Sequence, residues 1–595
     1  MQIPLITSLI HYYKVFYGYV GNKFYILVLL IFLGGLLDGI GISMLLPVLN
    51  IDRPESALDQ YTKTIYQLLE SIGINVSIFS LIMLLLIAFS IKGIFLFLQK
   101  ILLSYIRLSL AKTIKIGFCQ KYKAMKYSYY TNTSIGYLNN LVTLEVGRGV
   151  GALQRYIDVI NGIVFIFIYI SFAVIVNYRI TILVLVLSLL IFVMLRGLSR
   201  ISRKLSILVS ETNAKIQSLL IQTIYNFKYL KATDGFTHIF NYLFKNIEKN
   251  YIYQFKSSVL TAVTSSIIEP ITVLLLSGLV LYYVGYQGET ITEIFVLLIF
   301  FYKAFTNIIR FQTLWQGFNA KIGGLETIRK ADIILDKNVE VSGVKHIECL
   351  NKAIELRNVN YSYDSRQVLF NINLSIPKNK SIGIVGESGA GKTTLFDVFS
   401  GLLVPQTGRV CIDEIDYKEL DLACLRNLIG YITQEPVIFN DTIANNISLW
   451  ECDMRGLTCI ERMKNSAILA NCADFISDTE KGYETIIGDK GVKLSGGQRQ
   501  RIAIARELFK QPEIIIFDEA TSSLDTESEM LIQQSINSMK GTQTIVIISH
   551  RLSTIRDCDY IYVLKKGCII EEGSFNKLYR DEKSSFYNMC QAQNL

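Results

Sequence analysis

Charged residues are scarce in this chain of 595 residues, since Asp, Glu, Lys and Arg together make up only 18% of it. Soluble proteins usually have about a quarter of their residues charged. Apolar residues make up 51%, and the mean hydropathy is +0.37. This composition predicts segments buried in a membrane, and the length predicts several domains.

A dense cluster of basic residues is also missing, although the formal net charge is +9. Proteins that bind nucleic acids usually carry such a cluster, so we expect no nucleic-acid partner. The first residues lack a basic region and a cleavage site, so no cleaved signal peptide is expected. Residues 5–17 instead predict an amphipathic helix at the membrane interface, with Tyr12, Tyr13 and Tyr17 at headgroup depth.

Histidine is limited to four residues, and the spacing of Cys452 and Cys459 matches no zinc site. Of the ten cysteines, one is Cys119 and the others begin at Cys349. All of them lie in segments that we predict to be cytoplasmic. Because cytoplasmic thiols are usually reduced, we expect reduced cysteines.

Long apolar runs occupy the first half of the chain. Crossing a bilayer takes about 20 helical residues, and a turn at Asn177 separates two of the runs. The fourth run is short by itself, so its helix must extend into Arg196 and beyond to cross the bilayer. The six predicted spans are residues 24–49, 78–98, 157–176, 180–195, 259–284 and 291–311.

Basic residues are concentrated in two of the connections between these runs. Residues 99–156 hold nine Lys or Arg and residues 196–258 hold ten, whereas the other connections hold two, one and none. Connections between spans that are rich in Lys and Arg stay in the cytoplasm. We therefore predict that both long connections and both termini are cytoplasmic.

The character of the sequence changes after the last run. Short apolar strands at residues 381–385, 514–517 and 544–548 alternate with helical stretches, which is typical of an α/β domain. We predict a transmembrane domain over residues 1–336, with an interfacial helix, six spans and two long cytoplasmic loops. Residues 337–595 are predicted to form a nucleotide-binding domain.

A phosphate-binding loop follows the first of these strands. The pattern G-x-x-x-x-G-K-[ST] between a strand and a helix places backbone N–H groups around phosphate oxygens. Lys392 is predicted to reach the β- and γ-phosphates, and the Thr393 hydroxyl to coordinate Mg²⁺. The residues predicted to bind ATP here are Gly386, Glu387, Ser388, Gly389, Ala390, Gly391, Lys392, Thr393 and Thr394.

Two carboxylates end the strand at residues 514–517. Asp518 is placed to reach the Mg²⁺ shell, and Glu519 to polarise an attacking water. The separation in sequence between Lys392 and Asp518 leaves room for an inserted helical domain.

Residues 494–501, LSGGQRQR, closely resemble the signature of the ABC ATPase superfamily, and other markers follow in that family's order. By this resemblance, Tyr363 stacks on adenine, Gln434 links Mg²⁺ to the membrane domain, and His550 is the switch histidine. The family's signature and D-loop contact ATP on the opposite subunit. The corresponding residues are Leu494, Ser495, Gly496, Gly497, Gln498, Ser522, Ser523, Leu524 and Asp525.

The resemblance implies an ATP- and Mg²⁺-dependent ATPase that works as a pair of chains. Glu519, Gln498 and His550 fit the active pattern, which favours a homodimer over a heterodimer with one inactive site. Six spans fused to one ATPase resemble an ABC exporter of a bacterial inner membrane. The expected fold is therefore a membrane helical bundle followed by a P-loop ABC ATPase domain. A soluble ATPase is excluded by the spans.

The two long cytoplasmic connections also resemble those of ABC exporters. Tyr129 and Tyr130, followed by residues 136–138 and Glu145, are similar to the first loop, in which a short coupling helix touches the ATPase. Residues 222–232 are similar to the matching stretch of the second loop.

Three hypotheses remain open for what the protein transports and how. The first is export or flipping of a lipid, a lipid-linked glycan or another amphipath, the second is export of a peptide, protein or drug, and the third is an ATP-gated channel. Lys92, Lys303 and Arg310 lie within apolar runs, where charges often line a substrate path. They form a cavity for an anionic headgroup, or pair with Asp38 and Glu269, or, for Lys92 and Arg310, extend toward the cytoplasmic interface.

An external helix near residues 58–72 is loosely similar to that of bacterial flippases of lipid-linked oligosaccharides. A helical lid that packs on its own spans is an equal alternative. Membrane lipids are expected partners in every case.

Overall fold

The computed structural model describes residues 5–51, 60–176, 178–286, 291–364, 366–452, 456–520 and 524–593. The chain forms two compact units. The first consists of Met1–Met125 and Tyr129–Val339, and the second of Lys126–Ser128 and Glu340–Leu595. The domain boundary at residues 336 and 337 stays a prediction.

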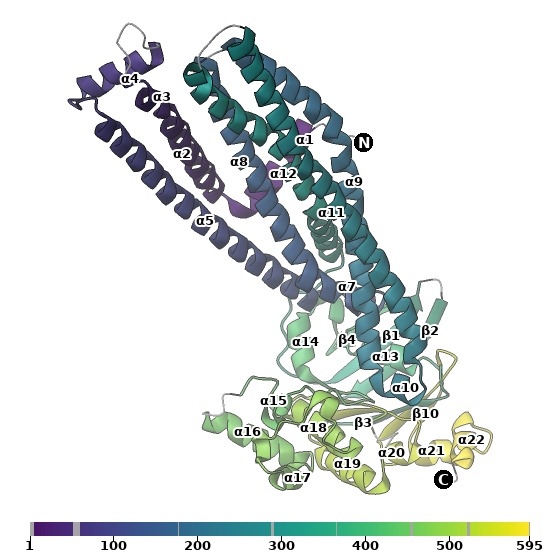
Figure 1. Ribbon diagram of the computed structural model, residues 1–595. Coiled ribbons are helices and arrows are strands. Elements are labelled where there is room, and N and C mark those ends of the chain that lie inside the picture. The colour runs from purple at the N-terminus through teal and green to yellow at the C-terminus, as the bar shows by residue number, and fades with distance from the viewer. Residues whose placement is uncertain are drawn as a thin grey trace. The chain divides into compact units, whose positions relative to one another are not determined.

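The first unit is built mainly of helices in its described part (Figure 1). Its helices are α1 (Leu5–Val20), α2 (Lys23–Ser43), α3 (Leu45–Leu49), α4 (Gln60–Ser71), α5 (Ile78–Lys123), α7 (Ile135–Asn140), α8 (Val146–Val176), α9 (Tyr178–Tyr225), α10 (Phe227–Ala232), α11 (Phe236–Val280) and α12 (Ile291–Lys337). Helix α6 (Tyr127–Thr131) begins in the second unit and ends in the first. A π-helical turn at Leu141–Glu145 joins α7 to α8, and another at Leu281–Tyr286 follows α11.

The predicted apolar runs lie in the long helices of this unit. Within the described residues, four helical segments are long and apolar enough to cross a membrane: Lys23–Leu49, Ile78–Lys123, Ile135–Ile175 and Phe236–Val280. The other two predicted runs fall in α9 and α12. At about 1.5 Å per residue, the 46 residues of α5 extend well beyond a hydrocarbon core of about 30 Å.

The long helices pack through α8 and α12, which run side by side (Figure 1). Tyr156 of α8 and Phe318 of α12 are buried between them, with ring centroids 5.7 Å apart. Serine caps the start of α5, because the Ser77 hydroxyl accepts a hydrogen bond from the Ser80 N–H and the Ser80 hydroxyl accepts one from the Ser77 N–H.

The predicted N-terminal helix forms, and one of its faces is buried against protein. α1 is helical, but Tyr12 and Phe16 are buried. The Tyr12 ring lies edge-on to Phe318, and Phe16 contacts Tyr156. Because these rings contact α8 and α12, this face of α1 packs on protein, and the headgroup depth of the tyrosines stays a prediction.

The predicted external helix forms as α4, whereas Leu58 lies outside the described residues. Tyr66 donates a hydrogen bond to the carbonyl of Pro47 at 2.7 Å, and Leu69 is buried. α4 therefore packs on the end of its own span, as the alternative of a helical lid requires.

The second unit contains two sheets. An antiparallel sheet has the order β2 (Arg366–Pro377), β1 (Ala353–Tyr363), β4 (Thr407–Ile412), β5 (Ile415–Asp416). A mainly parallel sheet has the order β10 (Cys568–Gly573), β9 (Tyr560–Lys565), β3 (Ser381–Gly386), β8 (Thr544–Ile548), β7 (Ile514–Asp518), β6 (Ile429–Ile432). The three predicted strands are β3, β7 and β8. Their apolar side chains are buried because helices cover a parallel sheet on both faces.

Helices of the second unit include α13 (Lys392–Phe399), α14 (Leu422–Leu428), α18 (Gly496–Phe509) and α19 (Thr526–Met539). Between β6 and α18 the chain forms α15 (Ile443–Ser448), α16 (Leu457–Leu469) and α17 (Ala473–Ser477), which is the inserted helical region expected from the motif spacing. The remaining helices are α20 (Leu552–Ile555), α21 (Phe575–Tyr579) and α22 (Ser585–Ala592).

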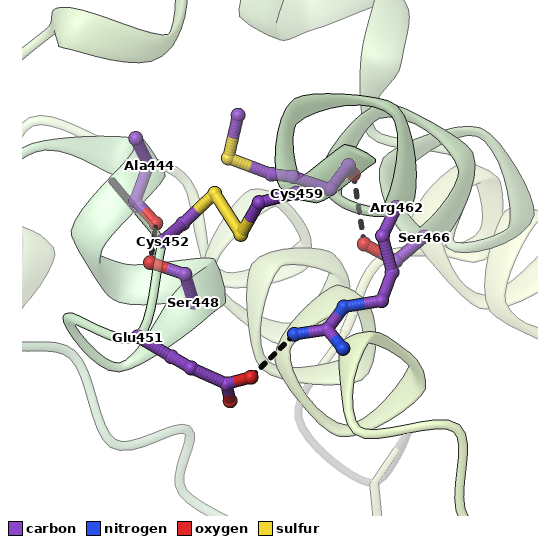
Figure 2. Close-up of a disulfide and its surroundings, with 8 residues drawn as sticks. Ala444, Ser448, Glu451, Cys452, Cys459, Arg462 and Ser466 are labelled. Atoms are coloured by element: carbon purple, nitrogen blue, oxygen red, sulfur yellow. Dashed lines mark hydrogen bonds and ion pairs between the residues drawn. A yellow bond between two sulfur atoms is a disulfide. The ribbon is translucent and has the colours of Figure 1, made fainter. Parts of the chain in front are cut away.

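A disulfide joins Cys452 to Cys459 at the start of α16 (Figure 2). The expectation that all cysteines are reduced is therefore wrong for this pair. The short connection from α15 to α16 brings the two Cα atoms to 5.7 Å, within the usual range for a disulfide. The other eight cysteines are free.

Candidate nucleotide-binding and catalytic site

The predicted phosphate loop lies between β3 and α13. Gly389 and Gly391 have φ angles of +78° and +102°, a left-handed backbone that glycine adopts without strain. A Cβ added at Gly386 would lie 2.2 Å from the Leu564 carbonyl oxygen, so β3 also needs glycine there. The loop leads directly into the first turn of α13, whose backbone N–H groups can bind an anion.

Lys392 is held by the loop itself. Its Nζ donates hydrogen bonds to the carbonyls of Gly386 at 2.9 Å and Glu387 at 3.0 Å. The side chain is buried, and this burial lowers the pKa of Lys392. A cation is therefore fixed where a phosphate loop needs one.

Three predicted residues meet beside this lysine. His550 Nε2 lies 2.8 Å from one carboxylate oxygen of Glu519, and the Gln434 amide donates to the other oxygen at 2.9 Å. Lys392 Nζ lies 3.1 Å from the same His550 nitrogen. The structure thus brings together the predicted water-activating, switch and loop residues.

Glu519 itself sits on an unusual backbone. Its φ of +48° is left-handed, which a residue with a Cβ adopts at a cost. Its N–H donates to the Ile548 carbonyl at 2.8 Å, which fixes the ends of β7 and β8 to each other. This conformation points the carboxylate toward His550.

Asp518 is the neighbouring carboxylate at the end of β7. Burial, followed by the charge of Glu519, raises the pKa of Asp518, and the Tyr431 hydroxyl donates to it at 3.4 Å. Burial and the charge of Asp518 raise the pKa of Asp397 to about 6. Crowded carboxylates of this kind are stabilised by a divalent cation.

Oxygen donors of the predicted Mg²⁺ set are consistent with that ion. Asp518 supplies a carboxylate, Gln434 an amide oxygen and Thr393 an exposed hydroxyl, all of them hard ligands. The residues therefore fit Mg²⁺.

The predicted signature begins α18. Ser495 caps this helix, since its hydroxyl accepts from the Gln498 N–H at 3.2 Å and its own N–H donates to the Gln498 side chain at 2.9 Å. A Cβ added at Gly497 would lie 2.1 Å from Ser528 Oγ, so α18 and α19 approach closely here. Gly496 starts α18, preceded by Leu494.

Asp525 of the predicted D-loop caps α19, accepting from the Ser528 N–H at 3.1 Å. Ser522 and Ser523 lie outside the described residues. Tyr363 ends β1 with a ring that is 40% exposed and lies edge-on to Tyr361, so a face remains open for stacking. In the described part of the chain, no hydrogen bond or ion pair joins residues 494–498 to the phosphate loop.

Comparison with known proteins agrees with this geometry. Residues 23–310 match the ABC transporter transmembrane region, and residues 369–522 match the ABC transporter family itself. The ATP-dependent lipid A-core flippase of Syntrophus aciditrophicus is 30% identical over 521 residues, which cover 84% of each chain.

The chain belongs to the ABC transporter family.

Other ABC transporters are similar over shorter stretches. The leukotoxin translocation ATP-binding protein LktB of a Pasteurella haemolytica-like species is 40% identical over 48% of this chain. The alpha-hemolysin translocation ATP-binding protein HlyB of Escherichia coli O6:H1 is 35% identical over 64% of it. The matched segments span only 40% and 54% of those two relatives.

A solved structure, a bacterial Atm1-family ABC exporter with ATP bound, has a TM-score of 0.75 at 22% identity. The match covers 97% of this chain and 100% of the other. This likeness confirms the predicted fold, a membrane helical domain followed by an ABC ATPase domain.

The transporter's predicted cavity residues are only partly brought together. Lys92 and Lys303 both pair with Asp38, whose side chain is 1% exposed; Lys303 Nζ lies 3.0 Å from it. Tyr169 also donates to this carboxylate. The alternative of mutual ion pairing therefore describes these two lysines. Arg310 is exposed and makes no such pair with Asp38, and the Glu269 side chain is outside the described residues.

Arg310 belongs to a second group of charges that the sequence analysis missed. Asp158 interacts electrostatically with four cations, and we name this set the inner basic cluster: Arg107, Arg155, Arg310 and Lys321. Arg155 lies 3.6 Å from the carboxylate. Arg107 and Arg155 lie in the first long connection and were counted only as loop charges, and Lys321 lies after the last apolar run. Their spacing around one carboxylate becomes visible only when α5, α8 and α12 pack.

Glycines let these side chains cross between helices. A Cβ added at Gly151 of α8 would come within 3.1 Å of Lys321 Nζ, and one at Gly317 of α12 within 3.8 Å of Arg155 Nε. Each cation thus lies over a glycine of the neighbouring helix. Arg107 Nε is buried and, within the described part of the chain, has no hydrogen-bond partner.

Proposed function

We propose that two copies of this chain form an ATP-driven exporter that hydrolyses ATP at the seam between their ATPase domains. The observation that carries this proposal is the separation of two half-sites in one chain. The Lys392–Glu519–His550 cluster and the Ser495 helix start are each complete locally, yet no described contact joins them. The chain belongs to a family in which half-transporters generally work as dimers, and a homodimer supplies two composite sites.

The proposed roles follow from the geometry. Lys392 and the backbone of residues 386–394 bind the phosphates, while Tyr363 stacks on the adenine. Thr393, Gln434 and Asp518 hold Mg²⁺, which supplies charge neutralisation of the phosphates. Glu519 accepts a proton from the attacking water, and His550 orients the Glu519 carboxylate. From the partner, residues 494–498 and Asp525 contact the γ-phosphate side.

Binding of ATP must favour the paired state more than the separated one, since otherwise no motion is driven. The short helices α6 and α10 are the proposed coupling elements, because they form in the two loops that resemble coupling loops. Hydrolysis then resets the pair. The expected location is a bacterial inner membrane, with both termini and the ATPase domain in the cytoplasm.

We propose an anionic lipid, lipid-linked glycan or related amphipath as the substrate. The inner basic cluster supports this class, because four cations interact electrostatically with one carboxylate and leave excess positive charge for a headgroup. The flippase relative matches most of this chain, whereas the toxin-translocation relatives match over part of their length. Export of a peptide or protein is the second candidate, supported by the higher identity to those relatives.

The substrate proposal is tested by ATPase activity of the purified protein in vesicles. Adding phosphatidylglycerol to phosphatidylcholine vesicles should stimulate hydrolysis, and the double variant Arg155→Gln/Lys321→Gln should lose most of that stimulation while keeping its basal rate. Lys330→Gln, an exposed lysine of α12 outside the cluster, is the matched control. Equal stimulation of the double variant, or stimulation by peptides alone, contradicts the proposal. Single-channel currents would indicate a channel.

A further inference from the structure

Three potential metal ligands meet in the second unit, and none of them is among the residues proposed to hold ATP. His346 lies in the segment before β1, Asp421 caps α14, and Cys424 lies in the first turn of α14. His346 and Cys424 are 78 residues apart in the chain, so no short sequence motif predicts that they meet. Their donor atoms all lie within 4.8 Å of one another.

Distances within this trio match those between ligands of one metal ion. His346 Nδ1 lies 3.2 Å from Cys424 Sγ and 3.6 Å from Asp421 Oδ2, and the sulfur lies 3.9 Å from that same oxygen. Zinc binds sulfur at about 2.3 Å and nitrogen or oxygen at about 2.0–2.2 Å. In a tetrahedral site, neighbouring ligands are therefore about 3.4–3.6 Å apart. The three donors surround one point.

A catalytic arrangement of the same residue types would look different. A histidine that activates a cysteine uses one ring nitrogen for the thiol and the other for the carboxylate. Here the thiol and the carboxylate both face Nδ1 of His346. Convergence on one nitrogen is the arrangement of a shared ligand and not of a proton relay.

Backbone hydrogen bonds hold the trio in place. The segment before His346 is paired with the segment before α14, since Lys345 donates to the Glu419 carbonyl and Asp421 donates to the Lys345 carbonyl, both at 2.8 Å. Asp421 uses only its Oδ1 for capping, accepting from Ala423 at 2.9 Å and from Ser342 at 3.3 Å. Its Oδ2 therefore remains directed toward His346 and Cys424.

We propose that His346, Asp421 and Cys424 bind a zinc ion. A thiolate, an imidazole and a carboxylate form a borderline-soft set that suits Zn²⁺ better than Mg²⁺ or Ca²⁺. The His346 side chain is 72% exposed, so water completes a four-coordinate shell. The zinc ion links the segment before β1 to the start of α14 and thereby stabilises this unit against unfolding.

The test uses the purified full-length protein, free of any affinity tag and of nucleotide. No reductant is added, so that the Cys452–Cys459 disulfide stays closed. Co²⁺ is titrated as a spectroscopic probe, because only a thiolate ligand gives a sulfur-to-cobalt charge-transfer band, and Zn²⁺ is then used to displace it. Expected are one bound Co²⁺ per chain and loss of the band in Cys424→Ser.

Matched variants separate the three ligands from their surroundings. Asp421→Asn keeps a capping residue but loses the carboxylate, and His346→Ala loses the imidazole. Both should weaken Zn²⁺ binding at least about tenfold, since even outer-shell changes cost about 10–100-fold. Cys349→Ser and Glu419→Gln remove a nearby thiol and a nearby carboxylate and should bind as the wild type does. Thermal unfolding without metal checks that each variant folds.

Zinc should also raise the unfolding temperature of the wild type and not that of His346→Ala. A charge-transfer band that survives in Cys424→Ser overturns the proposal, as does its absence from the wild type at saturating Co²⁺. An affinity that drops equally in the control variants overturns it as well.

Discussion

His550 Nε2 lies 2.8 Å from a carboxylate oxygen of Glu519. The two residues are 31 positions apart in the sequence and follow the ends of two neighbouring parallel strands. The Gln434 amide donates to the other oxygen at 2.9 Å. Both oxygens of Glu519 therefore have a fixed partner, and the carboxylate is positioned before any water attacks.

Glu519→Gln should stop hydrolysis and preserve ATP binding. General-base catalysis contributes about 10²–10⁴-fold to a rate, so we expect a fall of that size in kcat. Binding of a fluorescent ATP analogue should be unchanged, because the amide still accepts from Gln434 and keeps the side chain's shape. Glu480→Gln, an exposed carboxylate outside the site, is the control. Activity near the wild-type level would remove Glu519 from its proposed role.

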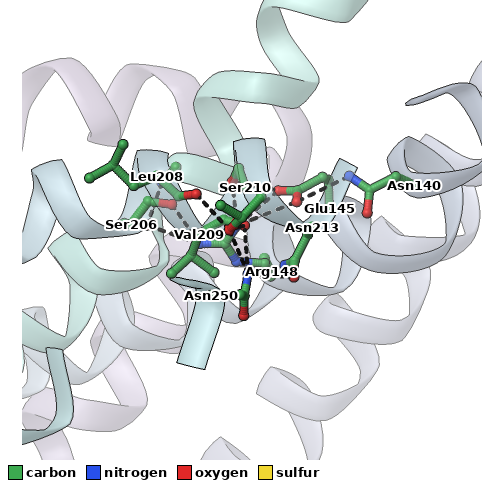
Figure 3. Close-up of polar contacts among 11 residues, drawn as sticks. Asn140, Glu145, Arg148, Ser206, Leu208, Val209, Ser210, Asn213 and Asn250 are labelled. Atoms are coloured by element: carbon green, nitrogen blue, oxygen red, sulfur yellow. Dashed lines mark hydrogen bonds and ion pairs between the residues drawn. The ribbon is translucent and has the colours of Figure 1, made fainter. Parts of the chain in front are cut away.

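A buried ion pair in the membrane unit supports a second prediction (Figure 3). Glu145 has no exposed surface and interacts with Arg148 at 3.2 Å and Ser210 at 3.0 Å, while Arg148 also donates to the Ser206 carbonyl at 3.0 Å. Removing one partner of such a pair leaves a buried charge and costs about 3–5 kcal/mol.

Arg148→Met should therefore lower the unfolding temperature of the detergent-purified protein. The double variant Glu145→Gln/Arg148→Met should recover much of the loss, because neither charge is then left alone. Additive losses in the double variant would mean that the pair does not act as a unit.

Close packing of α7 on α9 supports a third prediction. A Cβ added at Gly136 would lie 2.2 Å from the Cα of Ser218, so the helices cannot keep their separation if alanine replaces glycine. Such overpacking costs about 1–3 kcal/mol. Gly136→Ala should lower thermal stability, whereas Gly147→Ala, where a Cβ meets nothing within 4 Å, should not. Equal stability of the two variants would contradict this packing.

The raised pKa of Asp397 gives a pH-dependent prediction. Burial and Asp518 raise this pKa to about 6, above the usual value of about 3.9. The folded state therefore favours the protonated carboxyl, and its stabilising effect is full below about pH 4 and is lost as the pH rises through about 6.

Asp397→Asn should thus stabilise the Mg²⁺- and nucleotide-free protein at pH 8, and the gain should shrink toward pH 4. Unfolding temperatures across this range, compared with wild type, provide the measurement. A gain that is the same at both pH values would show that Asp397 titrates normally.

The local geometry of the candidate ATP site could be predicted largely from sequence, because its residues lie in short contiguous motifs. A strand, a glycine-rich turn and a helix place Lys392 without help from distant residues, and Asp518 and Glu519 follow directly from the end of β7. The roles of Gln434 and His550 were implied only by family resemblance, and their contacts with Glu519 were not predicted. The left-handed backbone of Glu519 carries no sequence signal at all.

Contacts between distant helices could not be predicted in the same way. Lys92 and Lys303 were recognisable as charges in apolar runs, but their shared partner Asp38 was only one of two candidates. The inner basic cluster and the burial of Tyr12 depend on how α1, α5, α8 and α12 pack. The trio of His346, Asp421 and Cys424 depends likewise on strand pairing across more than 70 residues.

The central claim is that nucleotide is hydrolysed only between two copies of the chain. It is tested most directly by ATPase rates per chain in lipid nanodiscs that hold either one or two copies. The proposed partner contact from Ser495 stabilises the γ-phosphate, and loss of such a donor costs about 10²–10³-fold. We predict hydrolysis in two-copy discs and a rate at least about 100-fold lower in one-copy discs. Equal rates per chain in both kinds of disc would contradict the account.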